Sequence, residues 1–495
     1  MLRSLKDSSV REVEDIRREL TTNEVVFLRP INGIGKHFLA YFFGREIFKL
    51  SFADILRMYN EHMEEAAPAS EDDFYSFVCA QYLDLKSSPQ DALLKHYRKT
   101  SEDLREVSTR ISDYEKEVVR LSAVEQKTED EEYSLKIYSH YIGLNKEVRE
   151  DLIDFMTSRR IRDFAVSECE NHWGLSMPLL FGRVPYNYSW YPRRYKIESL
   201  SPLGSKFAEL ELQEYYDIRR LYTTDKRAFE SRMNSFIRDH NIVDRIQNKL
   251  SQHHRLAERK KLLDDTIDAY KTGKKELFCS VIPVQVEGIF YDYCVELGFE
   301  EQTLHRKSLG GKLNLVVSRE KEFPRYEYYT FCFPRVRNKV AHGHIISSNV
   351  DYWADFLLLD LLDVVEMMES STLPVNRMVK LIRMVSADLD NVKALTRYAI
   401  IDQGDIKIPP FYNLTTEVAL LKEKLFEQPV WDFFRKLADE RDEMLRRGIL
   451  IIAQRFKEKG VNEAWCKELI AKLAPQKLPE FDEDDFLDKL SAFQN

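Results

Sequence analysis

Apolar residues recur along this chain at helical spacing, and the pattern is clearest between residues 104 and 121. There they lie three and four positions apart with charged residues around them: Leu104, Val107, Ile111, Tyr114, Val118 and Leu121. A narrow apolar seam of this kind is typical of a coiled coil or a helical hairpin. Because the seam covers fewer than three heptads, it is too short to dimerise the protein alone, and we favour the hairpin. The charged stretch 125–132 is expected to form the loop that ends it.

Four further segments have the pattern of elements that contribute to a core. Residues 242–270 place apolar side chains and His253 on one face of an amphipathic helix. Residues 278–297 are apolar almost throughout, with Pro283 interrupting the helical pattern. Residues 326–334 are apolar enough to be buried, and residues 352–365 have the pattern of a mostly buried helix.

Composition defines the fold class. The 495 residues include only 16 glycines and 16 prolines, and 32% of them are charged. This balance is typical of a soluble, mainly α protein, and the length predicts about three domains. We place a mostly helical N-terminal region at residues 1–200, a helical domain at residues 201–371 and a C-terminal helical region at residues 372–495.

The chain carries no sequence signal for export or membrane insertion. No stretch approaches the roughly 20 apolar residues of a membrane span, and the first residues lack the apolar segment of a signal peptide. The six cysteines form no Cys-x-x-Cys pair and lie mostly in apolar runs. Such cysteines indicate buried thiols in a reducing compartment rather than disulfides or a zinc site. We therefore expect a cytoplasmic protein without a membrane partner.

The residues that suggest chemistry gather at positions 335–344, with the sequence RVRNKVAHGH. Cleavage of an RNA phosphodiester needs proton transfer near neutral pH, which His342 can provide. It also needs a cation for the phosphate, which suits Arg337, and an orienting group, which suits Asn338. None of these residues requires a metal. The alternative is a surface arginine and a satisfied histidine at a helix end capped by Gly343, but the buried segments on both sides favour a site.

Spacing shows that one helix would present an incomplete site. Asn338 and His342 lie one helical turn apart on the same face, whereas Arg337 is turned partly away from that face. The pattern Arg-Asn-x-x-x-His resembles the signature of the HEPN superfamily, and the resemblance covers about residues 240–371. The family pools arginines and histidines from two facing motif helices, so the resemblance implies a homodimer.

The resemblance also implies a fold and a reaction. HEPN domains are four-helix bundles, and many of them are metal-independent endoribonucleases that leave a 2′,3′-cyclic phosphate and a 5′-hydroxyl. His342 would transfer protons, Arg337 would clamp the phosphate and Asn338 would orient them, with no cofactor. Nucleases of this size with helical regions around the motif are commonly bacterial toxins or proteins of abortive infection and phage defence. The N-terminal region would then sense a phage-derived or host trigger.

One carboxylate in the apolar segment 278–297 belongs to this hypothesis. Glu287 is flanked by Val286, Ile289 and Phe290, where a charge is costly unless it is paired. Many HEPN domains carry an acidic residue in the helix that packs against the motif helix. By that resemblance Glu287 would brace Arg337 or the histidine, and the alternative is a half-exposed glutamate at the edge of the helix.

A second segment suits single-stranded RNA. Residues 183–196 interleave aromatic rings with cations, and the residues we expect to contact RNA there are Arg183, Tyr188, Trp190, Arg193 and Arg194. Rings can stack on unpaired bases and cations can pair with phosphates, and Lys339 adds a cation in the motif itself. The alternative is an irregular loop whose rings pack on neighbouring helices. The net charge of −9 argues against a general nucleic-acid coat protein but allows a local groove.

Two other functions remain open from the sequence. The first is a non-catalytic HEPN-like dimer that acts as a scaffold or binds nucleic acid. The second is a nucleotide-dependent switch at residues 31–37, INGIGKH, which match a phosphate loop poorly, and we assign that segment to a loop. The adjacent His253 and His254 are expected to be polar helix surface, because neighbouring residues of a helix cannot both point at one metal. The acidic stretch 480–488 is expected to be solvated or to contact a partner.

Overall fold

The computed structural model describes residues 5–6, 8–22, 29–63, 66–169, 195–321, 323–341, 349–401, 406–460 and 463–493. Helix accounts for 77% of the structure, and no β-strand occurs within these ranges, so the expected mainly α class is confirmed. The chain divides into two compact units, Met1–Ser201 and Pro202–Asn495. None of the described helices is long and apolar enough to cross a membrane.

The first unit combines a small helical core with one long hairpin. Its core buries Phe38, Phe74 and Tyr75. The helical elements of the unit are α1 (Val10–Thr22), α3 (Ile31–Phe43), η1 (Arg45–Lys49), α4 (Phe52–Met63), α5 (Glu71–Leu83), α6 (Pro89–Ser122), α7 (Glu129–Thr157), α8 (Arg160–Cys169) and η4 (Ile197–Ser199).

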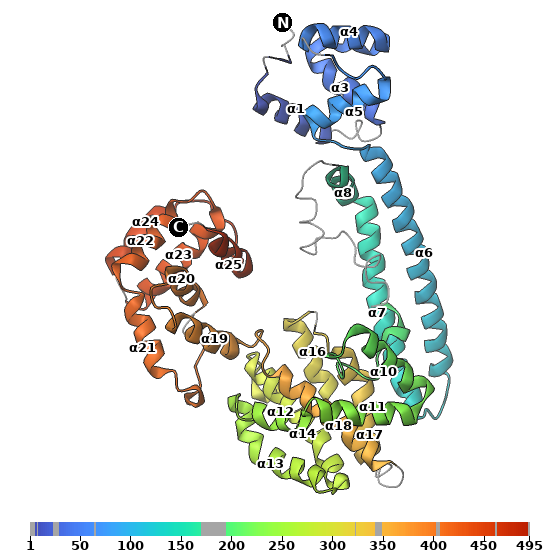
Figure 1. Ribbon diagram of the computed structural model, residues 1–495, viewed down its shortest axis with the longest axis vertical. Helices are drawn as coiled ribbons and strands as arrows, with labels where there is room; N and C mark the ends of the chain where they lie inside the picture. The colour runs from blue at the N-terminus through green and yellow to red at the C-terminus, as the bar shows by residue number, and fades with distance from the viewer. Residues whose placement is uncertain are drawn as a thin grey trace. The chain divides into compact units, whose positions relative to one another are not determined.

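The hairpin predicted from the apolar seam is formed by α6 and α7, which pack side by side (Figure 1). Ser88 caps α6, with Pro89 in its first turn, and the hydroxyl of Ser88 accepts a hydrogen bond from the amide of Asp91. Thr128 and Glu131 form a capping box at the start of α7. The loop is therefore shorter than expected, because residues 129–132 already belong to α7.

The expected loop at residues 31–37 is instead the start of helix α3, so that prediction was wrong. Gly35 faces α5 so closely that a Cβ atom there would lie 2.7 Å from Cδ1 of Tyr75. Lys36 extends to Glu71 of α5, with 3.4 Å between Nζ and Oε1. The glycine thus permits close helix packing, and the segment lacks the open loop whose amides surround a phosphate.

The second unit contains two cores, the first between residues 203 and 373. Helix α14 lies at its centre and packs against α13, α16, α17 and α18. The helical elements of this core are α10 (Leu212–Thr224), α11 (Lys226–Asp239), α12 (Ile242–Lys249), α13 (His254–Lys271), α14 (Lys275–Glu296), α15 (Glu301–Leu304), α16 (Leu309–Arg319), η5 (Tyr328–Cys332), α17 (Phe333–Ala341) and α18 (Val350–Met367).

The described helices differ from the sequence expectations at two places in this core. The amphipathic segment 242–270 is divided into α12 and α13, because the chain turns between Leu250 and His253. Conversely, α14 continues through Pro283 without a break. The expected burial of residues 326–334 and 352–365 is confirmed, since Tyr328, Tyr329 and nearly all of α18 are buried.

The second core of this unit spans residues 378–490. Its elements are α19 (Pro374–Ser386), α20 (Val392–Ile401), η6 (Pro410–Tyr412), α21 (Thr415–Lys424), α22 (Gln428–Asp439), α23 (Glu443–Glu458), α24 (Glu463–Leu473) and α25 (Glu483–Ala492). The acidic stretch 480–488 is not only solvated, because α25 inserts Phe486 and Leu490 into the core. Phe486 occupies the space beside Gly448, where a Cβ atom would lie 2.1 Å from its ring.

All six cysteines are reduced thiols, and five of them are buried while Cys332 is half-buried. Burial raises the pKa of each thiol, and it raises that of Cys79 in the first unit and Cys294 in the second to about 12. The structure therefore agrees with the expectation of buried thiols.

Candidate functional site

The motif helix α17 follows a π-helical turn, η5, without an intervening loop. Two tyrosines of this turn are held by aspartates of α18. The hydroxyl of Tyr328 donates to Oδ2 of Asp360 at 3.2 Å, and that of Tyr329 donates to Oδ2 of Asp363 at 3.0 Å. Single π-helical turns occur frequently at functional sites, and these bonds fix where α17 begins.

A buried ion pair lies beneath this turn. Lys206 is fully buried, contacts a carboxylate oxygen of Asp360 and donates to the hydroxyl oxygen of Tyr328 at 2.7 Å. Burial raises the pKa of Asp360 to about 6, although Lys206 opposes the shift, and burial likewise lowers the pKa of Lys206. Arg325 pairs with Asp363 at 2.8 Å. Each of these two buried carboxylates therefore has a cation, as burial of charge requires.

The structure brings two of the expected site residues together. Nε of Arg337 on α17 lies 2.9 Å from Oε1 of Glu287 on α14. The side chain of Arg337 is 45% exposed and that of Glu287 is 21% exposed, so the pair lies at the surface of the core with the carboxylate on its inner side. Nη1 of Arg337 is also 3.5 Å from Oδ1 of Asn338.

Other expected site residues lie apart or outside the described residues. The exposed Lys339 lies near a ring of α18, with its Nζ 5.8 Å from the centroid of Trp353. Tyr195, of the aromatic segment, is described and buried, and its carbonyl accepts a 2.9 Å hydrogen bond from Asn145. For Tyr195, burial therefore agrees with the alternative in which the rings of this segment pack on neighbouring helices. The expected residues that fall outside the described ranges are His342, Arg183, Tyr188, Trp190, Arg193 and Arg194.

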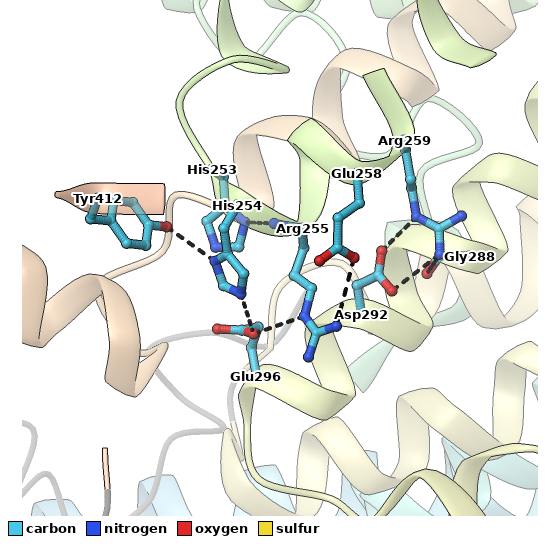
Figure 2. Close-up of polar contacts among 9 residues, drawn as sticks. All are labelled: His253, His254, Arg255, Glu258, Arg259, Gly288, Asp292, Glu296 and Tyr412. Atoms are coloured by element: carbon cyan, nitrogen blue, oxygen red, sulfur yellow. Dashed lines mark hydrogen bonds and ion pairs between the residues drawn. The ribbon is translucent and has the colours of Figure 1, made fainter. Parts of the chain in front are cut away.

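A second polar cluster, which sequence reasoning missed, lies where α13 begins and α14 ends (Figure 2). It contains His253, His254 and Glu296, and one donor atom of each lies within 4.8 Å of the other two. His253 is the N-cap of α13, with an extended backbone at φ −123° and ψ 131°. The argument that adjacent histidines on a helix diverge does not apply, because only His254 belongs to the helix.

The cluster is tied to its surroundings on two sides. Nε2 of His254 is 3.1 Å from Oε1 of Glu296, and its Nδ1 is 3.3 Å from the hydroxyl of Tyr412 in the second core. Arg255 also donates to Oε1 of Glu296 at 3.2 Å. One turn further along α13, Arg259 pairs with Asp292 at 2.5 Å (Figure 2).

The pKa values of two residues in the cluster are shifted from their usual values. Burial lowers the pKa of His253 to about 4, and the neighbouring His254 adds to the shift. Burial alone would raise the pKa of Glu296, but hydrogen bonds from His254 and Arg255 outweigh it and lower that pKa. At neutral pH the cluster therefore holds a neutral imidazole and a carboxylate side by side.

No family model, curated protein or solved structure matches this chain. The HEPN resemblance therefore rests on the motif residues alone and stays a prediction.

Proposed function

We propose that residues 201–371 form a HEPN-type bundle that cleaves RNA by metal-independent attack of a 2′-hydroxyl on the adjacent phosphorus. In support of such a bundle, α13, α17 and α18 all pack against α14. The motif residues Arg337 and Asn338 lie near the C-terminal end of α17, which ends at Ala341.

The contact between Arg337 and Glu287 carries the proposal. Glu287 holds the guanidinium through Nε, so the terminal nitrogens can face phosphate oxygens. The glutamate is a positioning residue, because it orients Arg337 without reaching the reacting atoms. Fixing an exposed arginine against a half-buried carboxylate costs side-chain entropy that a freely solvated arginine keeps. This cost favours a specific role for the pair.

The proposed reaction needs two proton transfers. A base removes the proton of the 2′-hydroxyl while its oxygen bonds to phosphorus, and an acid protonates the departing 5′-oxygen as the P–O bond breaks. His342 would serve in these transfers, and Asn338 would orient it. Arg337 would balance the charge on the phosphate. One chain supplies a single Arg337 and a single His342, so we propose a homodimer that joins two motif helices.

Total RNA incubated with the full chain, with and without EDTA, tests this reaction. The variants are Arg337→Ala and His342→Ala, with Arg220→Ala as a control because it removes an exposed arginine of the same unit. We expect wild type and control to cleave in both conditions and to leave cyclic phosphates, whereas the two motif variants lose at least about a hundredfold in rate. Equal cleavage by the motif variants would place the activity elsewhere.

The non-catalytic alternative gives a different result in the same experiment. Arg337 and Lys339 are both exposed on α17, so a dimeric nucleic-acid-binding protein or scaffold would retain RNA without cutting it. Binding that depends on Arg337 but not on His342, with no cleavage products, would favour that function.

The biological role we propose is antiviral defence by abortive infection, with residues 1–200 as the sensor of a phage-derived or host trigger. Expression in a bacterial host, with and without phage, tests it. We expect growth arrest that requires Arg337 and His342. Normal growth of infected cells, together with unchanged phage yield, would contradict this role.

A further inference from the structure

The cluster of His253, His254 and Glu296 contains polar atoms that the protein itself does not satisfy. Nε2 of His253 and Oε2 of Glu296 are buried and have no hydrogen-bond partner among the described residues. His253 is 3% exposed and Glu296 is 9% exposed. Buried polar groups are almost always paired, and leaving two unpaired atoms in one cluster destabilises the folded protein. A ligand that accepts electron pairs from both would remove that cost.

We propose that His253, His254 and Glu296 bind a divalent transition-metal ion of the Zn²⁺ class. This site is separate from the proposed RNA site and does not depend on the proposed function. Two imidazoles and one carboxylate form a ligand set that binds such ions with a position left open. A hard ion such as Mg²⁺ prefers oxygen ligands and is not expected there.

The distances suit this assignment. In a tetrahedral site with metal–ligand bonds of about 2.0–2.1 Å, neighbouring ligand atoms lie about 3.3 Å apart. Nε2 of His254 and Oε1 of Glu296 are 3.1 Å apart, and all three donor atoms lie within 4.8 Å of one another. To bring the donor nitrogen of His253 to the same spacing from the other two donor atoms, the His253 ring must rotate. Binding through its Nε2 puts the ring proton on Nδ1, so the long 3.3 Å hydrogen bond that Nδ1 accepts from the amide of Arg255 would be lost.

The surroundings supply the second layer that such sites need. Ligating histidines usually donate their other ring N–H to a fixed acceptor, and Nδ1 of His254 has the hydroxyl of Tyr412 at 3.3 Å (Figure 2). Arg255 donates to Oε1 of Glu296 and so fixes the carboxylate, whose other oxygen, Oε2, has no partner among the described residues.

The open position would be reached from a pocket of about 820 Å³. His253 and Tyr412 both line it, together with Lys380 and Arg383 of α19. Water or an anion could therefore approach the metal from this side. The ion would lie next to a contact between the two parts of the second unit, because its ligands belong to the start of α13 and the end of α14, whereas Tyr412 belongs to the second core.

Metal binding by the full chain tests the site directly. Protein stripped with a chelator is titrated with Zn²⁺ by calorimetry and with Co²⁺ by visible absorption, and Mg²⁺ serves as the hard-ion comparison. We expect one equivalent of Zn²⁺ per chain, a four-coordinate Co²⁺ spectrum without a thiolate band, and no binding of Mg²⁺. Absence of Zn²⁺ binding, or a thiolate band, would overturn the proposal.

Matched variants locate the site. Zn²⁺ binding should weaken at least about tenfold in each of the ligand variants His253→Gln, His254→Gln and Glu296→Gln. The controls are His305→Ala and Glu300→Gln, which change exposed residues just beyond α14 and should leave Zn²⁺ binding unchanged. Zn²⁺ should raise the unfolding temperature of wild type but not of His254→Gln.

Two results in this series would contradict the assignment. Wild-type affinity in all three ligand variants would overturn it. Loss of binding only in a His342→Ala, His344→Ala double variant would move the ion to the motif.

The two proposals fail independently. If cleavage is absent but Zn²⁺ binding depends on the three ligands, only the proposed function is lost. If cleavage depends on Arg337 but Zn²⁺ does not bind, only the metal site is lost.

Discussion

At the scale of single residues, the position of Arg337 depends on one carboxylate. The guanidinium is nearly half-exposed, and it pairs with Glu287 at 2.9 Å. An exposed arginine has many rotamers of similar energy, so a partner that is itself partly buried restricts it to few of them. The proposed phosphate clamp therefore needs both residues.

The variant Glu287→Gln separates this positioning role from general stability. It keeps an acceptor of the same size but removes the charge, so Arg337 should be held less firmly. We expect RNA cleavage to fall roughly tenfold to a hundredfold, while the unfolding temperature changes little. Glu276→Gln, at an exposed position on the same helix, is the control. Unchanged cleavage in Glu287→Gln would show that Arg337 does not rely on it.

His37 provides a pH-dependent test in the first unit. Burial lowers its pKa below 6.5, and the charge of Arg29 adds to the shift; its Nε2 is buried without a partner among the described residues. The folded state thus binds the proton less well than the unfolded state. Its contribution to stability is complete above about pH 6.5 and is lost as the pH falls through the lowered pKa.

The variant His37→Phe should remove that part of the pH dependence. Phenylalanine keeps the ring contact with Phe48, whose centroid lies 4.8 Å away. We expect urea denaturation midpoints of the variant and wild type to be similar near about pH 8, and the variant to gain relative to wild type near about pH 5.5. His305→Phe, at an exposed histidine, should show no such gain. Parallel pH profiles for His37→Phe and wild type would refute the prediction.

At the scale of elements, the sequence predicted helices well and their ends less well. The seam from Leu104 to Leu121 identified α6 because its apolar period matches one helix face. The division between α12 and α13 was missed, because Leu250 and His253 also continue that period. Residues 31–37 were misassigned because glycine is usual in loops, whereas Gly35 serves close packing on Tyr75. Contacts of this kind depend on a partner helix far along the chain, which local sequence does not specify.

Of the two candidate sites, only one could be predicted from the sequence. The motif and Glu287 could be proposed from residue types, because a lone charge in an apolar helix suggests a partner. The cluster of His253, His254 and Glu296 could not, because it depends on the extended backbone at His253 and on the pairing of α13 with α14. The carboxylate lies far from the histidines in the sequence, and no local pattern connects them.

Two glycines in helices should respond oppositely to alanine. Gly35→Ala places a Cβ atom 2.7 Å from Tyr75 and should destabilise the first unit by about 1–3 kcal/mol. A Cβ atom added at Gly143 on α7 would meet no neighbouring side chain within 4 Å, so Gly143→Ala should stabilise the hairpin by about 0.5–1 kcal/mol. Chemical denaturation measures both. A Gly35→Ala protein as stable as wild type would contradict the close packing of α3 on α5.

At the scale of the whole molecule, the two compact units each have an apolar core of their own. A fragment of residues 202–495 should therefore fold without the first unit. We expect it to show the helical circular dichroism of a folded protein and a cooperative thermal transition. If the proposed metal site is correct, the fragment should also keep it, since all three ligands lie within it. Aggregation or loss of helical signal would show that the first unit is needed for folding.

The buried thiols can report separately on the opening of each core. Cys79 and Cys169 belong to the first unit, Cys279 and Cys294 to the core around α14, and Cys466 to the C-terminal core. Because a buried thiol of high pKa reacts only when its surroundings open, the alkylation rate of each cysteine measures how often its own core opens. Three opening rates can thus be followed in one unlabelled chain by mass spectrometry, and an added trigger would reveal which core it loosens.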